Sequence, residues 1–158
     1  MGKHFYTTDP SEVTIAIVRD GKILEGVACY VLPHTENPQP PITPLYRLYN
    51  PSTDDHLYTI SQIERDERKS EGYIDENVAC DVFEPNQAPG TQPLFRAVNL
   101  QTGENFYTAN FQEFVTLTTP PPIGVGDFID GGDAGWIYDL NQASVPQGAV
   151  PFYRLFTP

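Results

Sequence analysis

PLYRLYNPSTDDHLYTISQIE, residues 44–64, is the segment that decides the fold, because related segments occur elsewhere in the chain. PLFRAVNLQTGENFYTANFQE, residues 93–113, repeats it at an interval of 49 positions. The third copy is divided between the chain ends, since PFYRLFTP (151–158) matches the first half and KHFYTTDPSE (3–12) matches the second. This division predicts that the first and last strands of the protein pair side by side.

Each repeat is predicted to begin with a β-hairpin and to continue into a short helix. In LYRLY (45–49) and HLYT (56–59), neighbouring side chains alternate between the two faces of a strand, and the NPSTDD between them has turn chemistry. Ser61 and Glu64 follow with the spacing of a capping box, in which the Glu side chain bonds back to the N-cap amide. The equivalent pairs are Asp9 with Glu12 and Asn110 with Glu113.

A third strand is expected to close each repeat, at residues 26–32, 77–83 and 135–140. The sequence therefore predicts an all-β fold with a short helix in each repeat. We expect a single domain, residues 1–158, built as a pseudo-threefold closed ring. Its repeats span approximately 44–92, 93–150, and 151–158 joined with 1–43.

A β-trefoil is the architecture most similar to this pattern, since it has three units of roughly 40–50 residues, within the range of known repeat periods, with four strands each. The alternative is a three-bladed mini-propeller, although propellers typically have at least about four blades. The capped helix is unusual for a trefoil.

The charge balance limits the partners. The chain has 158 residues, 39% of them hydrophobic, which is enough to bury a core. It carries 9 Lys and Arg against 21 Asp and Glu, for a net charge of −12. A phosphate backbone or an anionic bilayer surface would be repelled, so we expect no nucleic acid and no membrane as a partner.

No targeting or spanning segment is visible. The first twenty residues contain no basic stretch followed by an apolar one, and no apolar run approaches the roughly 18 residues of a spanning helix. We therefore expect a cytoplasmic protein. The alternative is a secreted protein, if Met1 and Gly2 are an added start on a mature secreted domain.

Cys29 and Cys80 lie at matched places, each within a VAC sequence of a closing strand. We predict that both are small buried hydrophobic residues, because free cysteine is among the most buried residue types. A disulfide that links two repeats is the alternative. Two cysteines at this separation are not typical of a metal site.

The repeats resemble a tandem tyrosine-rich repeat, Y-R-x-Y-N-x-x-T-G-D-H-F-Y-T, that is found in microbial and fungal proteins and is often appended to secreted hydrolases. The resemblance covers essentially the whole chain as three copies. The matching residues are Tyr46, Arg47, Tyr49, Asn50, Thr53, Asp55, His56, Tyr58 and Thr59 in one copy, and Arg96, Asn99, Thr102, Gly103, Asn105, Tyr107 and Thr108 in the next. That family has no settled activity, so the resemblance implies a recognition module. Asp54 replaces the usual glycine, and Asn105 replaces the usual histidine.

An aromatic residue recurs in each repeat beside an arginine and short polar side chains. Proteins hold sugars with an aromatic ring against the C–H face, while planar amide, carboxylate and guanidinium groups bond the hydroxyls. The predicted ligand-binding residues are Tyr46, Arg47, Asn50, Asp55, His56, Tyr58, Arg96, Asn99, Asn105, Tyr107, Arg154, His4 and Tyr6. The alternative is that the tyrosines belong to the core and that each arginine pairs with an acidic residue across its hairpin.

Catalysis is not indicated by any motif. The chain contains no G-x-S-x-G, no H-E-x-x-H and no phosphate loop. His4 and His56 occupy equivalent places in different repeats, so they are not expected to meet on one substrate. We expect no enzyme activity, no catalytic residue, no cofactor and no metal ion.

An insertion at residues 118–136 lengthens the last repeat. Its Asp127, Asp130 and Asp133 could ligate calcium, but their spacing matches no EF-hand, and a flexible solvated loop is favoured. Trp136 is expected in the core, at the strand position that alanine occupies in the other two repeats.

Two classes of function are consistent with these features. The favoured one is a lectin-like carbohydrate-binding protein with up to three related shallow sites, whose partners are glycans or glycoproteins. The alternative is a protease inhibitor that acts through rigid proline-rich loops, at residues 38–44 or 120–122. A glycan array and a panel of proteases would separate the two.

Overall fold

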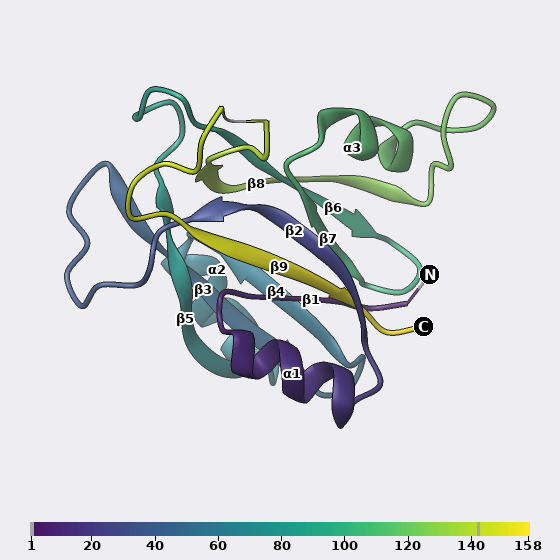
Figure 1. Cartoon of the computed structure of the whole chain (residues 1–158). Helices are drawn as coiled ribbons and strands as arrows, with labels where there is room; N and C mark the ends of the chain where they lie inside the picture. The colour runs from purple at the N-terminus through teal and green to yellow at the C-terminus, as the bar shows by residue number, and fades with distance from the viewer. Residues whose placement is uncertain (1, 142) are drawn as a thin grey trace.

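The computed structural model describes residues 2–141 and 143–158. These residues are mostly β, with 44% in strands and 17% in helices. The elements in chain order (Figure 1) are β1 (His4–Thr7), α1 (Pro10–Val18), β2 (Ile23–Val31), β3 (Ile42–Asn50), β4 (Asp55–Thr59), α2 (Gln62–Ser70), β5 (Ile74–Phe83), β6 (Gln92–Asn99), β7 (Asn105–Thr108), α3 (Phe111–Thr118), β8 (Phe128–Ile137) and β9 (Val150–Phe156). The prediction of a β-rich fold with a short helix in each repeat is confirmed.

The same unit of three strands and a helix occurs three times. We call β9, β1, α1 and β2 repeat I, β3, β4, α2 and β5 repeat II, and β6, β7, α3 and β8 repeat III. In each repeat the first strand lies between the other two. β9 pairs antiparallel with β1, with Arg154 opposite Tyr6, and the two chain ends lie close together in Figure 1. The predicted pairing of the first and last strands is therefore confirmed.

The strands form a curled half-barrel. Repeats II and III share a six-stranded sheet, joined where Phe83 pairs with Trp136. Repeat I forms a three-stranded sheet, which contacts the others through the isolated bridges Tyr30 to Tyr138 and Leu32 to Asp81. Each repeat thus contributes three strands and a helix, where the trefoil comparison predicted four strands.

The helices begin at the predicted N-caps, but the capping glutamates have another role. The N-cap side chains accept hydrogen bonds from first-turn amides, and they belong to Asp9, Ser61 and Asn110. The N-cap amides themselves donate to threonines two residues earlier, which are Thr7, Thr59 and Thr108. The glutamates are therefore not needed by the N-cap amides and bond elsewhere.

Three tyrosines from the three hairpins form the centre of the core. The rings of Tyr6, Tyr58 and Tyr107 are at most 1% exposed, and they meet edge to face with centroids 5.3–5.6 Å apart. Tyr58 Oη donates to the Tyr6 carbonyl at 2.7 Å and accepts from the Tyr6 amide at 2.9 Å. Tyr6 bonds the backbone of Tyr107 in the same way, and Tyr107 bonds that of Tyr58.

This cycle corrects the prediction that the three tyrosines bind a ligand. Each hydroxyl satisfies a buried amide and a buried carbonyl of another repeat, which would otherwise cost free energy. Burial raises the pKa of all three phenols, so they stay protonated and can keep donating. The tyrosines therefore hold the repeats together.

Cys29 and Cys80 are both free and fully buried, as predicted, and burial raises the pKa of both thiols.

The insertion differs from the flexible loop that was expected, because β8 begins within it at Phe128. Trp136 is half-buried, and it pairs with Pro93. Its counterparts across Pro44 and Pro151 are Asp81 and Tyr30, so it does not occupy the alanine position. No helix in the described part of the chain is long and apolar enough to cross a membrane.

Candidate binding clefts between the repeats

Each repeat is joined to the preceding one by an ion pair. An arginine on the first strand of one repeat contacts the first-turn glutamate of the preceding helix. The nearest nitrogen to oxygen distances are 2.8 Å, 2.8 Å and 3.1 Å for Arg47 with Glu12, Arg96 with Glu64, and Arg154 with Glu113. These ion pairs therefore join neighbouring repeats. The alternative from the sequence placed them across the arginine's own hairpin instead.

Two of these glutamates, Glu12 and Glu64, have a lowered pKa and are ionised at neutral pH. The hydrogen bond from Arg47 is the main cause that holds the pKa of Glu12 below its ordinary value. Burial pushes the pKa of Glu64 upward, but hydrogen bonds from Thr59 and Arg96 and the charge of Arg96 outweigh it, so this pKa is lowered too. The pairs are charge-assisted bonds, roughly twice as strong as neutral ones.

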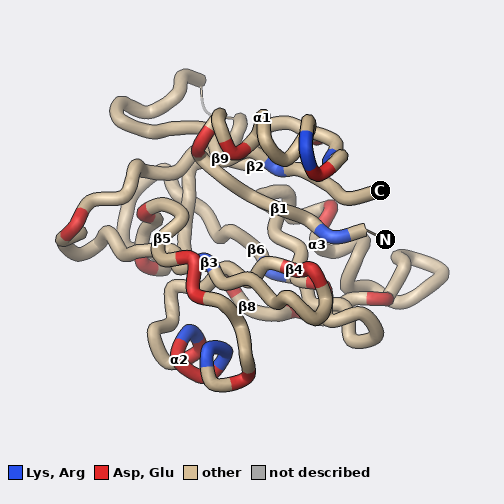
Figure 2. Tube along the Cα trace, turned by 90° about the horizontal axis from the view of Figure 1, so that it is seen from below, with Lys and Arg blue, Asp and Glu red and all other residues tan. Residues whose placement is uncertain are grey.

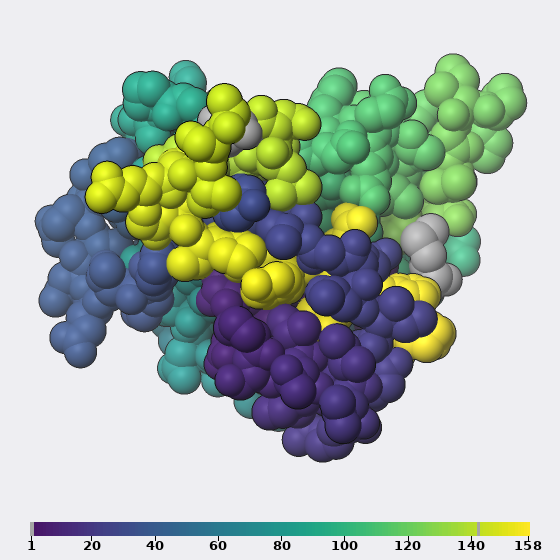
Figure 3. All heavy atoms as spheres, viewed as in Figure 1, coloured from purple at the N-terminus to yellow at the C-terminus, as the bar shows by residue number. Residues whose placement is uncertain are grey.

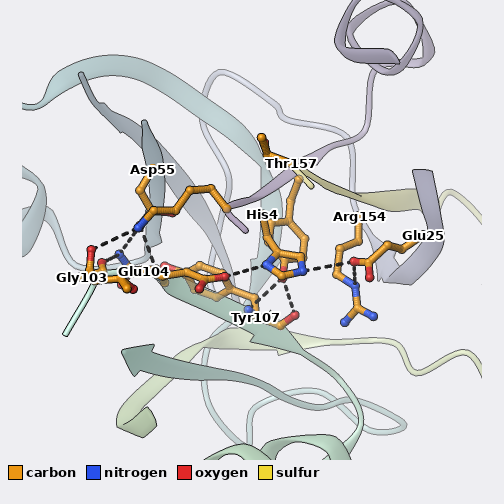
Figure 4. Close-up of polar contacts among 12 residues, drawn as sticks. His4, Glu25, Asp55, Gly103, Glu104, Tyr107, Arg154 and Thr157 are labelled. Carbon is orange, nitrogen blue, oxygen red and sulfur yellow. Dashed lines mark hydrogen bonds and ion pairs between the residues drawn. The ribbon is translucent and has the colours of Figure 1, made fainter. Parts of the chain in front are cut away.

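Repeats I and II add a histidine and a second glutamate to the ion pair. Arg47 Nε lies 2.8 Å from Glu76 Oε2, and His56 Nε2 lies 3.4 Å from the same oxygen. Arg154 and His4 contact Glu25 in the same way, at 2.9 Å and 3.3 Å. We call this arrangement the His–Glu–Arg cluster, and Figure 4 shows the copy around His4.

Repeat III has lost both added members. Asn105 replaces the histidine, and Arg96 Nε donates to its Oδ1 at 2.9 Å. Gly131 replaces the glutamate, because Asp130 pairs with Ala97 where Asp75 pairs with Leu48. Neither the histidine nor the second glutamate is therefore present in repeat III. Because the insertion shifts the alignment of repeat III with the other two, the glycine at the glutamate position cannot be recognised from the sequence. Only the replacement of histidine by Asn105 is visible there.

The histidine of the His4 copy is closed to solvent. His4 is 4% exposed, and its Nδ1 lies 2.8 Å from Oε1 of Glu104, which is fully buried (Figure 4). Asp55 occupies the same position in repeat II, and its Oδ2 accepts two hydrogen bonds from Asn105. These side chains stabilise the contacts between hairpins and are not accessible to a ligand.

The His56 copy faces solvent. His56 lies between the rings of Phe5 and Tyr49, with centroids 4.9 Å and 5.0 Å away. It lines a cleft of about 560 Å³ between α1 and the β3–β4 hairpin, which we call the first cleft. The cleft is lined by Phe5, Glu12, Ile15, Ala16, Arg19, Asp20, Lys22, Arg47, Tyr49, Asp54, His56, Glu76 and Thr157.

The polar groups of the first cleft are held in place. Tyr49 is half-buried, and its hydroxyl donates to Asp54 at 3.0 Å, which raises the pKa of the phenol. Burial pushes the pKa of Glu76 upward, but the hydrogen bond from His56 and the charge of Arg47 outweigh it, and the pKa lies below its ordinary value. The cleft therefore presents an aromatic ring beside ordered charged groups.

A second cleft, of about 780 Å³, lies where repeat III meets repeat I. In Figure 3 repeat III is green and repeat I is purple, blue and yellow. The second cleft is lined by Glu25, Gly26, Val27, Ala28, Gln92, Pro93, Phe95, Thr108, Ala109, Asn110, Phe111, Gln112, Glu113, Asp139, Leu140, Asn141 and Arg154. Both clefts thus contain an arginine with two glutamates.

The predicted ligand-binding residues divide into three groups. Arg47 and His56 line the first cleft, and Arg154 lines the second. Tyr46 and Asn50 are half-buried outside both, the former with Arg65 stacked 4.5 Å above its ring. The remaining eight are buried, which corrects their assignment to a ligand site: His4, Tyr6, Asp55, Tyr58, Arg96, Asn99, Asn105 and Tyr107.

Several residues of the first cleft were missed as site residues. Tyr49 is part of the repeat motif, so the motif itself carried a signal for it. The sequence around Glu12 indicates a helix-capping residue. Nothing in the sequence marks Glu76 as a site residue, because its place beside Arg47 follows from the register of β3 with β5. Among the described side chains, no group of three or more His, Cys, Asp or Glu could hold a metal ion.

The chain belongs to a family described as a domain of unknown function, DUF5648, whose model matches residues 1–120. No curated protein and no solved structure matches the chain. The matched residues extend from β1 to the end of α3 and include Tyr49, His56 and Glu76 of the first cleft.

Proposed function

We propose that the protein is a lectin-like carbohydrate-binding protein and that the first cleft is its principal site. The observation that carries this proposal is the meeting of Tyr49, His56 and Arg47 in one solvent-open cleft. In repeat I the equivalent histidine, His4, is buried, and in repeat III Val98 and Asn105 replace the tyrosine and the histidine. Of up to three related sites, the one between repeats I and II is therefore the one in which the histidine lines a cleft.

The chemistry of the first cleft suits a polyhydroxylated ligand. A sugar ring can place its C–H face on Tyr49, while the Glu76 carboxylate, the Arg47 guanidinium and the His56 imidazole offer acceptors and donors to its hydroxyls. The cleft also lies within the size range of small-ligand sites, roughly 300–1,000 Å³. Because charges of both signs line it, a neutral ligand pays no net repulsion.

We further propose that the three repeats form a closed, β-trefoil-like ring and that the chain is one of the tyrosine-rich repeat modules it resembles. The pairing of β1 with β9 and the cycle of bonds among Tyr6, Tyr58 and Tyr107 support the ring. We propose binding without catalysis, cofactor or metal.

The expected partners are glycans or glycoproteins, met in the cytoplasm or, if the protein is secreted, outside the cell. We propose no nucleic-acid or membrane partner. The charge distribution supports this, because the basic residues of α2 alternate with acidic ones and form no uniform basic surface there (Figure 2).

A glycan array followed by affinity measurements tests the proposal. Two substitutions have natural precedents in repeat III, Tyr49→Val after Val98 and His56→Asn after Asn105. Each should weaken binding of an array-positive glycan about tenfold, the scale of one stacking or charge-assisted contact. Leu100→Ala, at an exposed residue outside both clefts, should change nothing. A blank array with folded protein, or full affinity in both variants, would overturn the proposal.

The protease-inhibitor alternative depends on the proline-rich links, in which Pro40 and Pro121 are exposed. Inhibitors present a preorganised loop to an enzyme cleft, which limits the entropy lost on binding. Inhibition of a member of a protease panel, together with a blank glycan array, would place this function ahead of carbohydrate binding.

A further inference from the structure

The second cleft is lined by an exposed aromatic ring. Phe111 is 62% exposed at the first position of α3. The equivalent residues are Pro10 in repeat I and Gln62 in repeat II, both ordinary at a helix start. An aromatic side chain in the lining of a cleft is typical of a small-ligand site, and this one is present in one repeat of three.

The ring of Phe111 is supported from below. It contacts Phe95, with centroids 5.5 Å apart, and Phe95 stacks on Phe114 at 5.1 Å. Phe114 is buried in a hydrophobic cluster between α3 and the β6–β8 strands. Phe111 is therefore the outermost member of a packed row of three rings, and it lines the cleft from a position supported by the other two.

Two carboxamides beside this ring are each fixed at one end. Gln92 Nε2 donates to the carbonyl of Ala109 at 2.7 Å, and Asn110 Oδ1 accepts from the amides of Gln112 and Glu113 at 2.9 Å and 3.1 Å. Gln92 Oε1 and Asn110 Nδ2 have no hydrogen-bond partner among the described residues. The cleft thus presents one oriented acceptor and one oriented donor.

The charges of the second cleft disfavour anions. Arg154 is the sole cation among the described residues of its lining, and Glu113 and Glu25 both pair with that guanidinium, at 3.1 Å and 2.9 Å. Asp139 adds a further carboxylate to the lining. A phosphate, sulfate or uronate group would meet net negative charge, whereas a neutral hydroxyl can bond the amides and the carboxylates without repulsion.

We propose that the second cleft is a separate binding site for a neutral saccharide, in which Phe111 stacks on a sugar ring and Gln92 and Asn110 bond its hydroxyls. The ligand class rests on the proposed function, but the site and its residues are independent of the first cleft. Two unlike sites on one rigid chain would bind a glycan that reaches both more tightly than either site alone.

An NMR titration of the whole protein with three neutral oligosaccharides, cellohexaose, chitohexaose and mannohexaose, tests this site. At least one should shift the backbone amides of residues 108–113. Phe111→Gln, the residue of repeat II, should weaken that binding about tenfold. Asn110→Ser, which keeps the N-cap that Ser61 provides in repeat II, removes the Nδ2 donor and should weaken it as well. Tyr49→Val and Leu100→Ala should leave these shifts unchanged.

The outcomes separate the two proposals. Shifts confined to residues 49–56, with the same sugar affinity in Phe111→Gln as in wild type, would refute the second site. The first cleft would then remain the proposed carbohydrate site. Shifts confined to residues 108–113 would support the second site and refute the placement of the first. Binding of a Lys- or Arg-rich peptide by Phe111 with no response to any of the three sugars would refute the ligand class of both.

Discussion

Tyr58→Phe is the substitution that most sharply tests the structural role of the repeated tyrosines. It removes only the hydroxyl, which bonds the amide and the carbonyl of Tyr6 at 2.9 Å and 2.7 Å. Tyr6 is fully buried, so both backbone groups lose their partner without access to water. Each orphaned buried group costs about 1–3 kcal/mol, and the expected loss in the free energy of unfolding is therefore at least about 2 kcal/mol.

Chemical denaturation, with the free energy extrapolated to water, measures this loss. At this chain length each kcal/mol corresponds to a fall in Tm of roughly 2–4 °C. Tyr6→Phe and Tyr107→Phe remove equivalent bonds and should cost similar amounts. Tyr46→Phe is the matched control, because the Tyr46 hydroxyl has no hydrogen bond within the described residues, and it should stay within about 0.5 kcal/mol of wild type.

A loss below about 1 kcal/mol for any of the three buried tyrosines would refute the reasoning, since the unpaired backbone groups alone should exceed it. A loss in Tyr46→Phe as large as that in Tyr58→Phe would refute it too. The hydroxyl cycle would then be incidental to stability.

Other predictions concern the buried and half-buried charges. Arg47→Lys cannot make the bidentate contact with Glu12, and it should lower the free energy of unfolding by about 1 kcal/mol, measured by urea titration. The pKa of Glu12 is lowered in the folded state, so the ionised side chain stabilises the fold above the unfolded pKa of about 4.3. This stabilisation is lost as the pH falls through the folded-state pKa. Glu12→Gln should therefore flatten the acid limb of a curve of unfolding free energy against pH. Burial raises the pKa of Asp55, so ionisation of its carboxyl opposes folding as the pH rises through the folded-state pKa. Asp55→Asn should raise the free energy of unfolding by roughly 1 kcal/mol at pH about 7, and the difference should vanish in acid. A lower free energy of unfolding for this variant at neutral pH would contradict the reasoning. At Gly131 a Cβ would lie 2.7 Å from Val98 Cγ2, so Gly131→Ala should cost about 1–3 kcal/mol, and a thermal melt equal to wild type would contradict the crowding.

The repeat pattern was sufficient to predict the hairpins, the helix N-caps and the pairing of the chain ends, because these depend on local chemistry that recurs at fixed spacing. The role of the tyrosines could not be predicted in the same way. Alternation assigns Tyr58 and His56 to the same face of β4. The sequence of this five-residue strand does not indicate that Tyr58 lies at the centre of the core while His56 lines a cleft.

The candidate site was only partly predictable for a similar reason. Arg47 and His56 are in the motif, but Glu12 comes from the preceding repeat and is brought in by the packing of repeats. Glu76 comes from β5 of the same repeat and is brought in by the register of β5 against β3. Phe111 gave no signal, because its importance appears when its exposure and the cleft beside it are known.

The most direct test of the division between binding and structural residues compares Tyr49→Val and Tyr58→Phe in one experiment, with glycan affinity and unfolding free energy measured on both proteins. We expect Tyr49→Val to lose about tenfold in affinity at unchanged stability, and Tyr58→Phe to lose at least about 2 kcal/mol of stability at unchanged affinity per folded molecule. The opposite pattern, with Tyr58 controlling affinity and Tyr49 controlling stability, would contradict the assignment of the tyrosines to the core and of the first cleft to ligand binding.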